Sequence, residues 1–239
     1  DIRTEADWWE DHLSLKASFP VAVKADKAFY EIPFAAIGRT TRFETLWEKA
    51  RYEVPALRWA DLADERGGVA LLNDSKYGYD IHGRVMKLSL LRSPTWPDPL
   101  ADRGRHEFTY SLYPHAGSWS EAQVVRRAQE LNQPLLTRVF TGSRGKLPPV
   151  QGFFAVDGEG VIIDAIKLAE DGSGLVFRLY EANGKAEDAT LRCFQPPQAA
   201  VLTDLLEKET APLAVKDGGI ALSFRPFEIK TVKARFAGR

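Results

Sequence analysis

The stretch that decides the fold is residues 68–91, which read GVALLNDSKYGYDIHGRVMKLSLL. Two apolar runs, residues 69–72 and 85–91, flank a polar segment over residues 73–84. Short apolar runs bounded by Gly, Asn and Asp are typical of strands that end in turns. The stretch therefore predicts two β-strands joined by a polar connection.

The same pattern recurs on both sides of this stretch. Upstream, residues 12–19 and 28–34 alternate between apolar and polar side chains, which buries one face of a strand and exposes the other. Downstream, six further runs are separated by turns that contain Gly, Asp and Asn: residues 152–156, 160–166, 175–181, 189–194, 220–224 and 227–234. Many short strands with such turns predict an all-β sandwich rather than alternating β-α units.

One segment departs from this rhythm and divides the chain. Residues 118–132 have apolar side chains at near-helical spacing, with Ser118 or Ser120 as N-cap and Pro134 after the end. The Gly- and Pro-containing segment 141–149 follows as the best linker. We therefore expect a larger antiparallel sandwich over residues 1–150 and a smaller one over residues 151–239, with one short helix between them.

Composition and charge exclude several classes of partner. The chain has 33 acidic and 32 basic residues and no run of five or six like charges, so we expect no nucleic-acid partner. No apolar run approaches the roughly 20 residues that cross a bilayer, so we expect no membrane partner. Cys193 is the only cysteine, which excludes an internal disulfide and favours a reducing, cytoplasmic location. Because the chain starts with Asp1 and has no signal-peptide pattern, we interpret it as beginning within a longer protein.

The residue chemistry shows no complete catalytic or metal-binding set. The four histidines never fall in a zinc-binding spacing such as HExxH, and neither a GxSxG nucleophile motif nor a phosphate-binding glycine motif is present. Carboxylates are plentiful, and glycosidases use pairs of them, but the sequence cannot pair them across a cleft. A glycosidase that uses carboxylates within this chain therefore stays open as one alternative.

An ordered series of motifs extends along the whole chain. Residues 59–62 read WADL and are followed by the stretch from residue 68, by LSLLRSP at residues 88–94 and by HEFTY at residues 106–110. Similar matches occur in flanking segments: residues 15–20, 30–34, 165–167, 175–181 and 226–231. The series resembles the C-terminal region of glycoside hydrolase family 38 α-mannosidases, in the branch with bacterial, vacuolar and cytosolic enzymes. Ala35 stands where that family usually has Gly.

The resemblance implies both a fold and a parent enzyme. The larger sandwich would be galactose-mutarotase-like and incomplete at its N-terminus, and the smaller one immunoglobulin-like. The parent would be a retaining α-mannosidase that hydrolyses terminal α-linked mannose, with a catalytic Asp and a divalent metal, usually zinc, in an N-terminal catalytic domain. No residue of this chain matches those catalytic motifs.

We therefore expect a fragment that lacks catalytic residues, metal and cofactor and that is inactive alone. Its partners would be the N-terminal catalytic domain of the same enzyme and a mannose-containing oligosaccharide. An apolar edge left uncovered by the missing strands would favour self-association of the fragment.

Residues 73–80 are the candidate substrate-binding segment. Asn73, Lys76, Tyr77 and Tyr79 offer the mixed donors, acceptors and stacking rings that a sugar needs, and we expect them at the substrate pocket or at the rim between domains. The alternative is a turn and interface network in which the asparagine caps, the lysine pairs and the tyrosines pack.

The rival function is an autonomous carbohydrate-binding module. Its sugar platforms would be tryptophans, namely Trp8, Trp9, Trp59 and Trp96. We expect Trp59, in a strand-like run, to lie in the core, and Trp96, between prolines, to be exposed.

Overall fold

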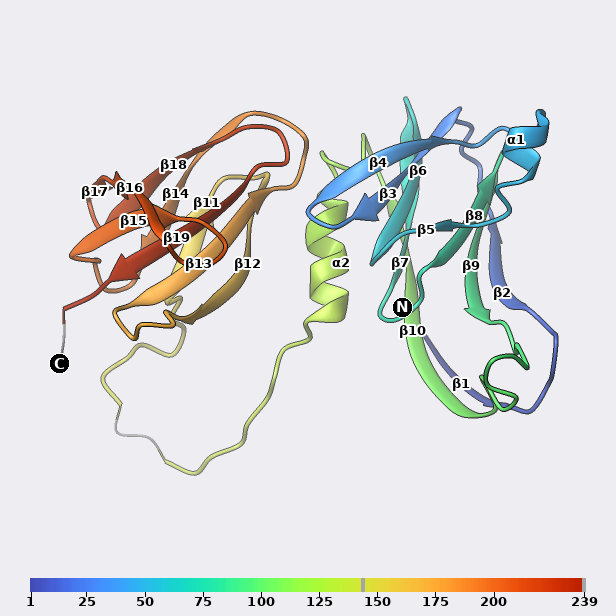
Figure 1. Ribbon diagram of the computed structural model, residues 1–239, viewed down its shortest axis with the longest axis horizontal. Coiled ribbons are helices and arrows are strands. Elements are labelled where there is room, and N and C mark those ends of the chain that lie inside the picture. Colours follow the sequence, from blue (N-terminus) through green and yellow to red (C-terminus); the bar gives the residue numbers. More distant parts are fainter. Residues whose placement is uncertain (143–144, 238–239) are drawn as a thin grey trace. The chain divides into compact units, whose positions relative to one another are not determined.

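The computed structural model describes residues 1–142 and 145–237, and strands make up most of its regular structure. Over this part of the chain the strands form four antiparallel sheets. Contacts divide the chain into two compact units, residues 1–135 and 136–239 (Figure 1). Each unit contains two sheets with a shared apolar core. The expected all-β class, with two successive sandwiches, is confirmed.

The first unit combines a six-stranded and a four-stranded sheet. The order of the larger sheet is β1-β10-β7-β6-β3-β4. Its strands are β1 (Ile2–Trp8), β3 (Lys27–Ile32), β4 (Ala35–Thr40), β6 (Trp59–Asp64), β7 (Gly67–Asn73) and β10 (Gly104–His115). The smaller sheet has the order β2-β9-β8-β5 and contains β2 (Leu15–Pro20), β5 (Val54–Pro55), β8 (Gly78–His82) and β9 (Val85–Leu91).

The core of the first unit is built by alternate side chains of both sheets. Tyr30 and Leu71 of the larger sheet belong to one buried cluster with Tyr79, Ile81 and Leu88 of the smaller one. None of the five is more than 2% exposed. Full burial of one aliphatic side chain contributes roughly 1.5–3 kcal/mol before the entropic cost of folding. The period-two pattern of the sequence therefore decides which face of each strand meets the core.

The deciding stretch contains one strand more than the sequence predicts. The two apolar runs form β7 and β9 as expected, but the polar segment between them contains β8, which pairs with β9. Only two apolar side chains of β8, Tyr79 and Ile81, point into the core. An alternation of two residues is too short to predict a strand from the sequence alone. Because β7 and β8 belong to different sheets, the loop between them crosses the sandwich.

The described part of the first unit contains two helices, α1 (Leu46–Lys49), which was not expected, and α2 (Val124–Asn132). The expected helix is α2, which is shorter than expected: it begins at Val124 rather than near Ser118, and it contacts β6 and β7 (Figure 1). Gln123 precedes it in the left-handed conformation at φ 53°, which interrupts the helical path. Ser118 does not cap α2; its amide and hydroxyl donate to Glu121 instead. None of the described helices is long and apolar enough to cross a membrane.

The second unit pairs a five-stranded with a four-stranded sheet. The first has the order β12-β13-β19-β15-β16, with β12 (Val161–Leu168), β13 (Leu175–Glu181), β19 (Ile229–Arg235), β15 (Ala199–Thr203) and β16 (Glu209–Leu213). The second has the order β11-β14-β18-β17, with β11 (Phe154–Asp157), β14 (Glu187–Cys193), β18 (Gly219–Phe224) and β17 (Val215–Lys216). Strands β15, β16 and β17 were not expected. Strand β16 is a largely exposed edge strand with Pro212 and lacks an apolar alternation, and β17 has only two residues.

The connection between the units lies in residues 133–153, where the described residues form neither helix nor strand. Contacts place the division after Leu135, and the boundary expected near residue 150 falls within the same connection. The expected linker, residues 141–149, also lies there, although Ser143 and Arg144 are outside the described residues.

A buried ion pair ties β6 to the end of β10. His115 Nε2 lies 2.7 Å from Asp61 Oδ1, and the two side chains are 2% and 0% exposed. Burial raises the pKa of Asp61, and the hydrogen bond from His115 only partly offsets this. Burial by itself would lower the pKa of His115. The hydrogen bond to Asp61 and the negative charge of Asp61 have a larger, opposite effect, so the pKa of His115 is raised. Each side chain therefore depends on the other inside the sandwich.

We predict that Asp61→Ala destabilises the first unit by about 3–5 kcal/mol, because it leaves a buried imidazole without its partner. Urea unfolding followed by tryptophan fluorescence measures this loss selectively, since all six tryptophans lie in residues 1–135. Glu107→Ala is the matched control, because Glu107 pairs with Arg3 on the surface. Its unfolding curve should coincide with that of the wild type, and equal losses in both variants would contradict the assignment.

Candidate functional site

The loop between β7 and β8 is organised around the side chain of Asn73. That side chain is buried, and its Nδ2 donates to the carbonyl of Leu57 (3.1 Å) and to the hydroxyl of Tyr79 (2.5 Å). Its Oδ1 accepts from the backbone amides of Ser75 (2.9 Å) and Lys76 (2.5 Å). Asparagine favours such turns because its amide mimics a backbone group. These bonds engage both ends of the Asn73 amide and set the path of the loop.

Tyr79 lies on the inner side of this loop. It is fully buried, its ring meets that of Tyr30 edge-on at 6.3 Å, and its hydroxyl accepts from Asn73. Burial raises the pKa of Tyr79 well above its usual value, although the bond from Asn73 acts in the opposite direction. The tyrosine is therefore a neutral part of the core that anchors the start of β8.

Lys76 and Tyr77 lie on the outer side of the loop. Lys76 is half-buried, and its Nζ lies 4.3 Å from the centre of the Phe108 ring, a cation–π geometry. Burial lowers the pKa of Lys76, while the carboxylates of Asp102 and Asp74 act to raise it. Tyr77 is 60% exposed, and its carbonyl accepts from the amide of Ala56 (3.1 Å). Of the four candidate residues, these two present side chains that a ligand could reach.

The far end of β8 holds a polar network that the sequence analysis missed. Asp80 accepts from His82 Nδ1 (2.5 Å) and Lys87 Nζ (3.0 Å), and Lys16 Nζ lies 3.7 Å away. Burial alone would raise the pKa of Asp80, but the bonds from Lys87 and His82 leave it lowered. A sequence signal existed for one contact, because Asp80 and Lys87 stand opposite each other in the β8–β9 hairpin.

The described residues provide no metal centre. Within residues 1–142 and 145–237, no three His, Cys, Asp or Glu side chains are grouped so that they could hold a metal ion. Zinc implied by the family resemblance therefore does not fit these residues, and we derive no chemical step through it. Burial also raises the pKa of Cys193, which disfavours the nucleophilic thiolate.

Both tryptophan expectations are confirmed. Trp59 is fully buried and stacks on Trp119 with ring centres 5.3 Å apart. Trp96 is 84% exposed, and Trp9 is 65% exposed with its indole donating to Asp7 (2.7 Å).

Comparisons with known proteins agree with the architecture. Two family models match the chain: the "Glycosyl hydrolases family 38 C-terminal domain" over residues 1–100 and the "Glycosyl hydrolases family 38 C-terminal beta sandwich domain" over residues 160–232. A crystal structure of an alpha-mannosidase from Enterococcus faecalis V583 superposes with a TM-score of 0.82, covering 98% of this chain and 27% of that protein at 20% identity. This structural likeness supports the fold.

Sequence relatives give the same family. Human "Alpha-mannosidase 2C1" is 43% identical over 234 residues, which cover 95% of this chain and 22% of the relative. The "Alpha-mannosidase" of Saccharomyces cerevisiae is 34% identical over 265 residues, covering 99% and 24%. The chain thus spans about a quarter of the length of these relatives, and the resemblance found in its motifs is confirmed. Together with the two family models, these matches show that the chain belongs to glycosyl hydrolase family 38, as the C-terminal region of that family's proteins.

Proposed function

We propose that this chain is the C-terminal, non-catalytic part of a retaining α-mannosidase that hydrolyses terminal α-linked mannose. The observation that supports this most directly is that relatives called α-mannosidases match nearly the whole chain while extending to about four times its length. The nucleophile and a divalent metal such as zinc would belong to the N-terminal catalytic domain. The role of this chain would be to support that domain.

The loop between β7 and β8 is the part that we propose shapes the substrate pocket or its rim. Lys76 and Tyr77 would supply the contacts, because their side chains reach the surface. Asn73 and Tyr79 would act as positioning residues, because their hydrogen bonds hold the backbone between them. The four candidate residues thereby divide into an outer contacting pair and an inner supporting pair.

The rival function, an autonomous carbohydrate-binding module, is favoured by the exposed indoles of Trp9 and Trp96. Aromatic rings of this kind can stack on the apolar face of a pyranose. A binding module would recognise sugar without the rest of the enzyme, whereas a supporting part would not.

We expect the purified 239-residue chain to leave a chromogenic α-mannoside uncleaved, because no residue of its sequence matches the catalytic motifs that the family resemblance implies. Isothermal titration with mannose and mannobiose should show no heat of binding. Turnover by the chain alone would contradict the proposal, and micromolar affinity for either sugar would favour the binding module.

In the longer enzyme, we predict that Tyr77→Phe lowers kcat/KM about fivefold, the effect of losing one hydrogen bond of roughly 1 kcal/mol. Its thermal stability should stay unchanged, because the ring is mostly exposed. Tyr79→Phe is the matched control: it removes a buried hydroxyl bonded to Asn73 and should lower stability instead. A Tyr77→Phe enzyme that is unstable but has normal kinetics would support the packing alternative.

Self-association of the chain also stays a prediction. Exposed apolar side chains that would support it lie at the start of the connection between the units: Leu135, Leu136, Val139 and Phe140. Surfaces of this kind mark contact sites in soluble proteins. Gel filtration at increasing concentration should therefore show a species larger than 26.7 kDa, and a monomer at every concentration would contradict this.

A further inference from the structure

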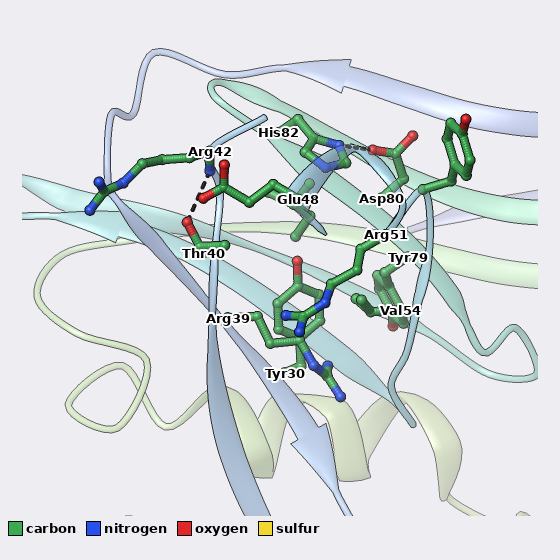
Figure 2. A pocket seen from close by; sticks show the side chains of 12 residues that line it. Tyr30, Arg39, Thr40, Arg42, Glu48, Arg51, Val54, Tyr79, Asp80 and His82 are labelled. Atoms are coloured by element: carbon green, nitrogen blue, oxygen red, sulfur yellow. Dashed lines mark hydrogen bonds and ion pairs between the residues drawn. The ribbon is translucent and has the colours of Figure 1, made fainter. Parts of the chain in front are cut away.

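A small cavity of about 30 Å³ opens beside β8, on the side where β4 and the segment around α1 (Leu46–Lys49) meet. Figure 2 shows that side chains from separate parts of the chain converge on it: Arg39 from β4, Arg51 from the segment after α1, and Tyr30 from β3. Tyr52 also lines the cavity and is 70% exposed, so the cavity is open to solvent on this side.

Arg39 lines the cavity and has a buried hydrogen-bond donor that is unpaired among the described residues. Its Nη1 is buried and has no hydrogen-bond partner within the described part of the chain. Its guanidinium carbon lies 4.7 Å from the centre of the Tyr30 ring. Burial lowers the pKa of Arg39, and the positive charge of Arg51 lowers it further, while Tyr30 acts in the opposite direction. A buried guanidinium donor without a partner is costly, because such groups are normally paired.

Carboxylates of the described residues compensate this positive charge only in part. Arg39, Arg42 and Arg51 all line the cavity. The charge of Arg42 helps to lower the pKa of Glu48, but no carboxylate of the described residues acts on the pKa of Arg39. The two carboxylates in the wall are engaged elsewhere. Glu48 accepts from the amides of Glu44 (3.0 Å) and Thr45 (2.9 Å), where it caps α1, and Asp80 accepts from His82 and Lys87.

We propose that this cavity is a binding site for one carboxylate group, held by Arg39 and Arg51. A guanidinium presents parallel N–H donors that match the two oxygens of a carboxylate, and a charge-assisted bond would satisfy the buried Nη1. The enclosed volume is small, about 30 Å³, which favours a small head group.

The carboxylate can come from two sources. It can be a free small carboxylate, or it can be an Asp or Glu side chain from the part of the longer enzyme outside this chain. Only the second source rests on the proposed function. The exposed Leu46 and Trp47 of α1, at 84% and 80%, lie on the helix that also supplies Glu48 to the cavity wall and would suit contact with a polypeptide.

Saturation-transfer NMR of the formate proton, with the 239-residue chain at constant ionic strength, tests the site directly. Formate should give a saturable signal, and inorganic phosphate, which is larger, should compete weakly. Arg51→Gln should weaken formate binding roughly tenfold or more, because it removes a charge-assisted contact. Arg39→Gln should abolish the signal, and Arg66→Gln is the matched control, since Arg66 pairs with Asp64 at the surface.

Absence of a formate signal from the wild-type chain, or equal affinity in the wild type and Arg51→Gln, would overturn the site. Because Arg51 is exposed, this variant tests the site even if Arg39→Gln fails to fold. The same measurement on the longer enzyme separates the two sources. If the formate signal is retained, the ligand is a free carboxylate. If the signal is lost and Arg51→Gln lowers the stability of the longer enzyme, the carboxylate is a side chain of that enzyme. Failure of the α-mannosidase proposal would leave the result with the 239-residue chain unchanged.

Discussion

The first unit depends on a constraint at Asn73, where the chain leaves one sheet and enters the other. A buried amide is tolerated only when its donors and acceptor are bonded, and here they hold Leu57, Tyr79 and the turn that follows. The backbone carbonyl of Asn73 also accepts from Asn132 Nδ2 (2.9 Å), at the end of α2. One residue thereby links both sheets, the loop and the helix, and it directs the neighbouring side chains inward or outward.

Polar groups inside this unit fall into two kinds. Some are satisfied by the chain itself: Asn73 by its turn, and Asp80 by His82 and Lys87. Among the described residues, three buried side-chain atoms have no hydrogen-bond partner: Arg39 Nη1, Trp59 Nε1 and Asp61 Oδ2, whose carboxylate is bonded to His115 through Oδ1 alone. Satisfied groups stabilise the fold and need no further explanation. Of the three atoms without a partner, Arg39 Nη1 belongs to a cationic side chain that lines a cavity together with Arg51, which is why this cavity, rather than the most polar loop, suggests a new ligand site.

Much of the fold could be predicted from local pattern. The runs that became β7, β9, β13 and β19 could be identified because each is an apolar-rich run bounded by turn residues, and period-two alternation identified the runs that became β2 and β3. Several strands were missed, among them β8 and β15, which have only five residues each, and the edge strands β1, β4 and β16. The helix was placed correctly at its end but not at its start, since the left-handed Gln123 has no sequence signature. For the candidate site, the four residues were found as a group, but not their division into an inner and an outer pair.

By itself the sequence determined the all-β class, the family, the absence of a recognisable catalytic motif and the loop that is richest in sugar-compatible side chains. These follow from periodicity and from motif order, which are properties of residues close together in the chain. The tertiary structure alone decided which polar groups are buried, that Asp61 meets His115 across 54 positions, and that Arg39 lies against Tyr30 without a carboxylate. The physical reason is that burial and charge compensation depend on which distant strands pack together, and local sequence does not encode those distances.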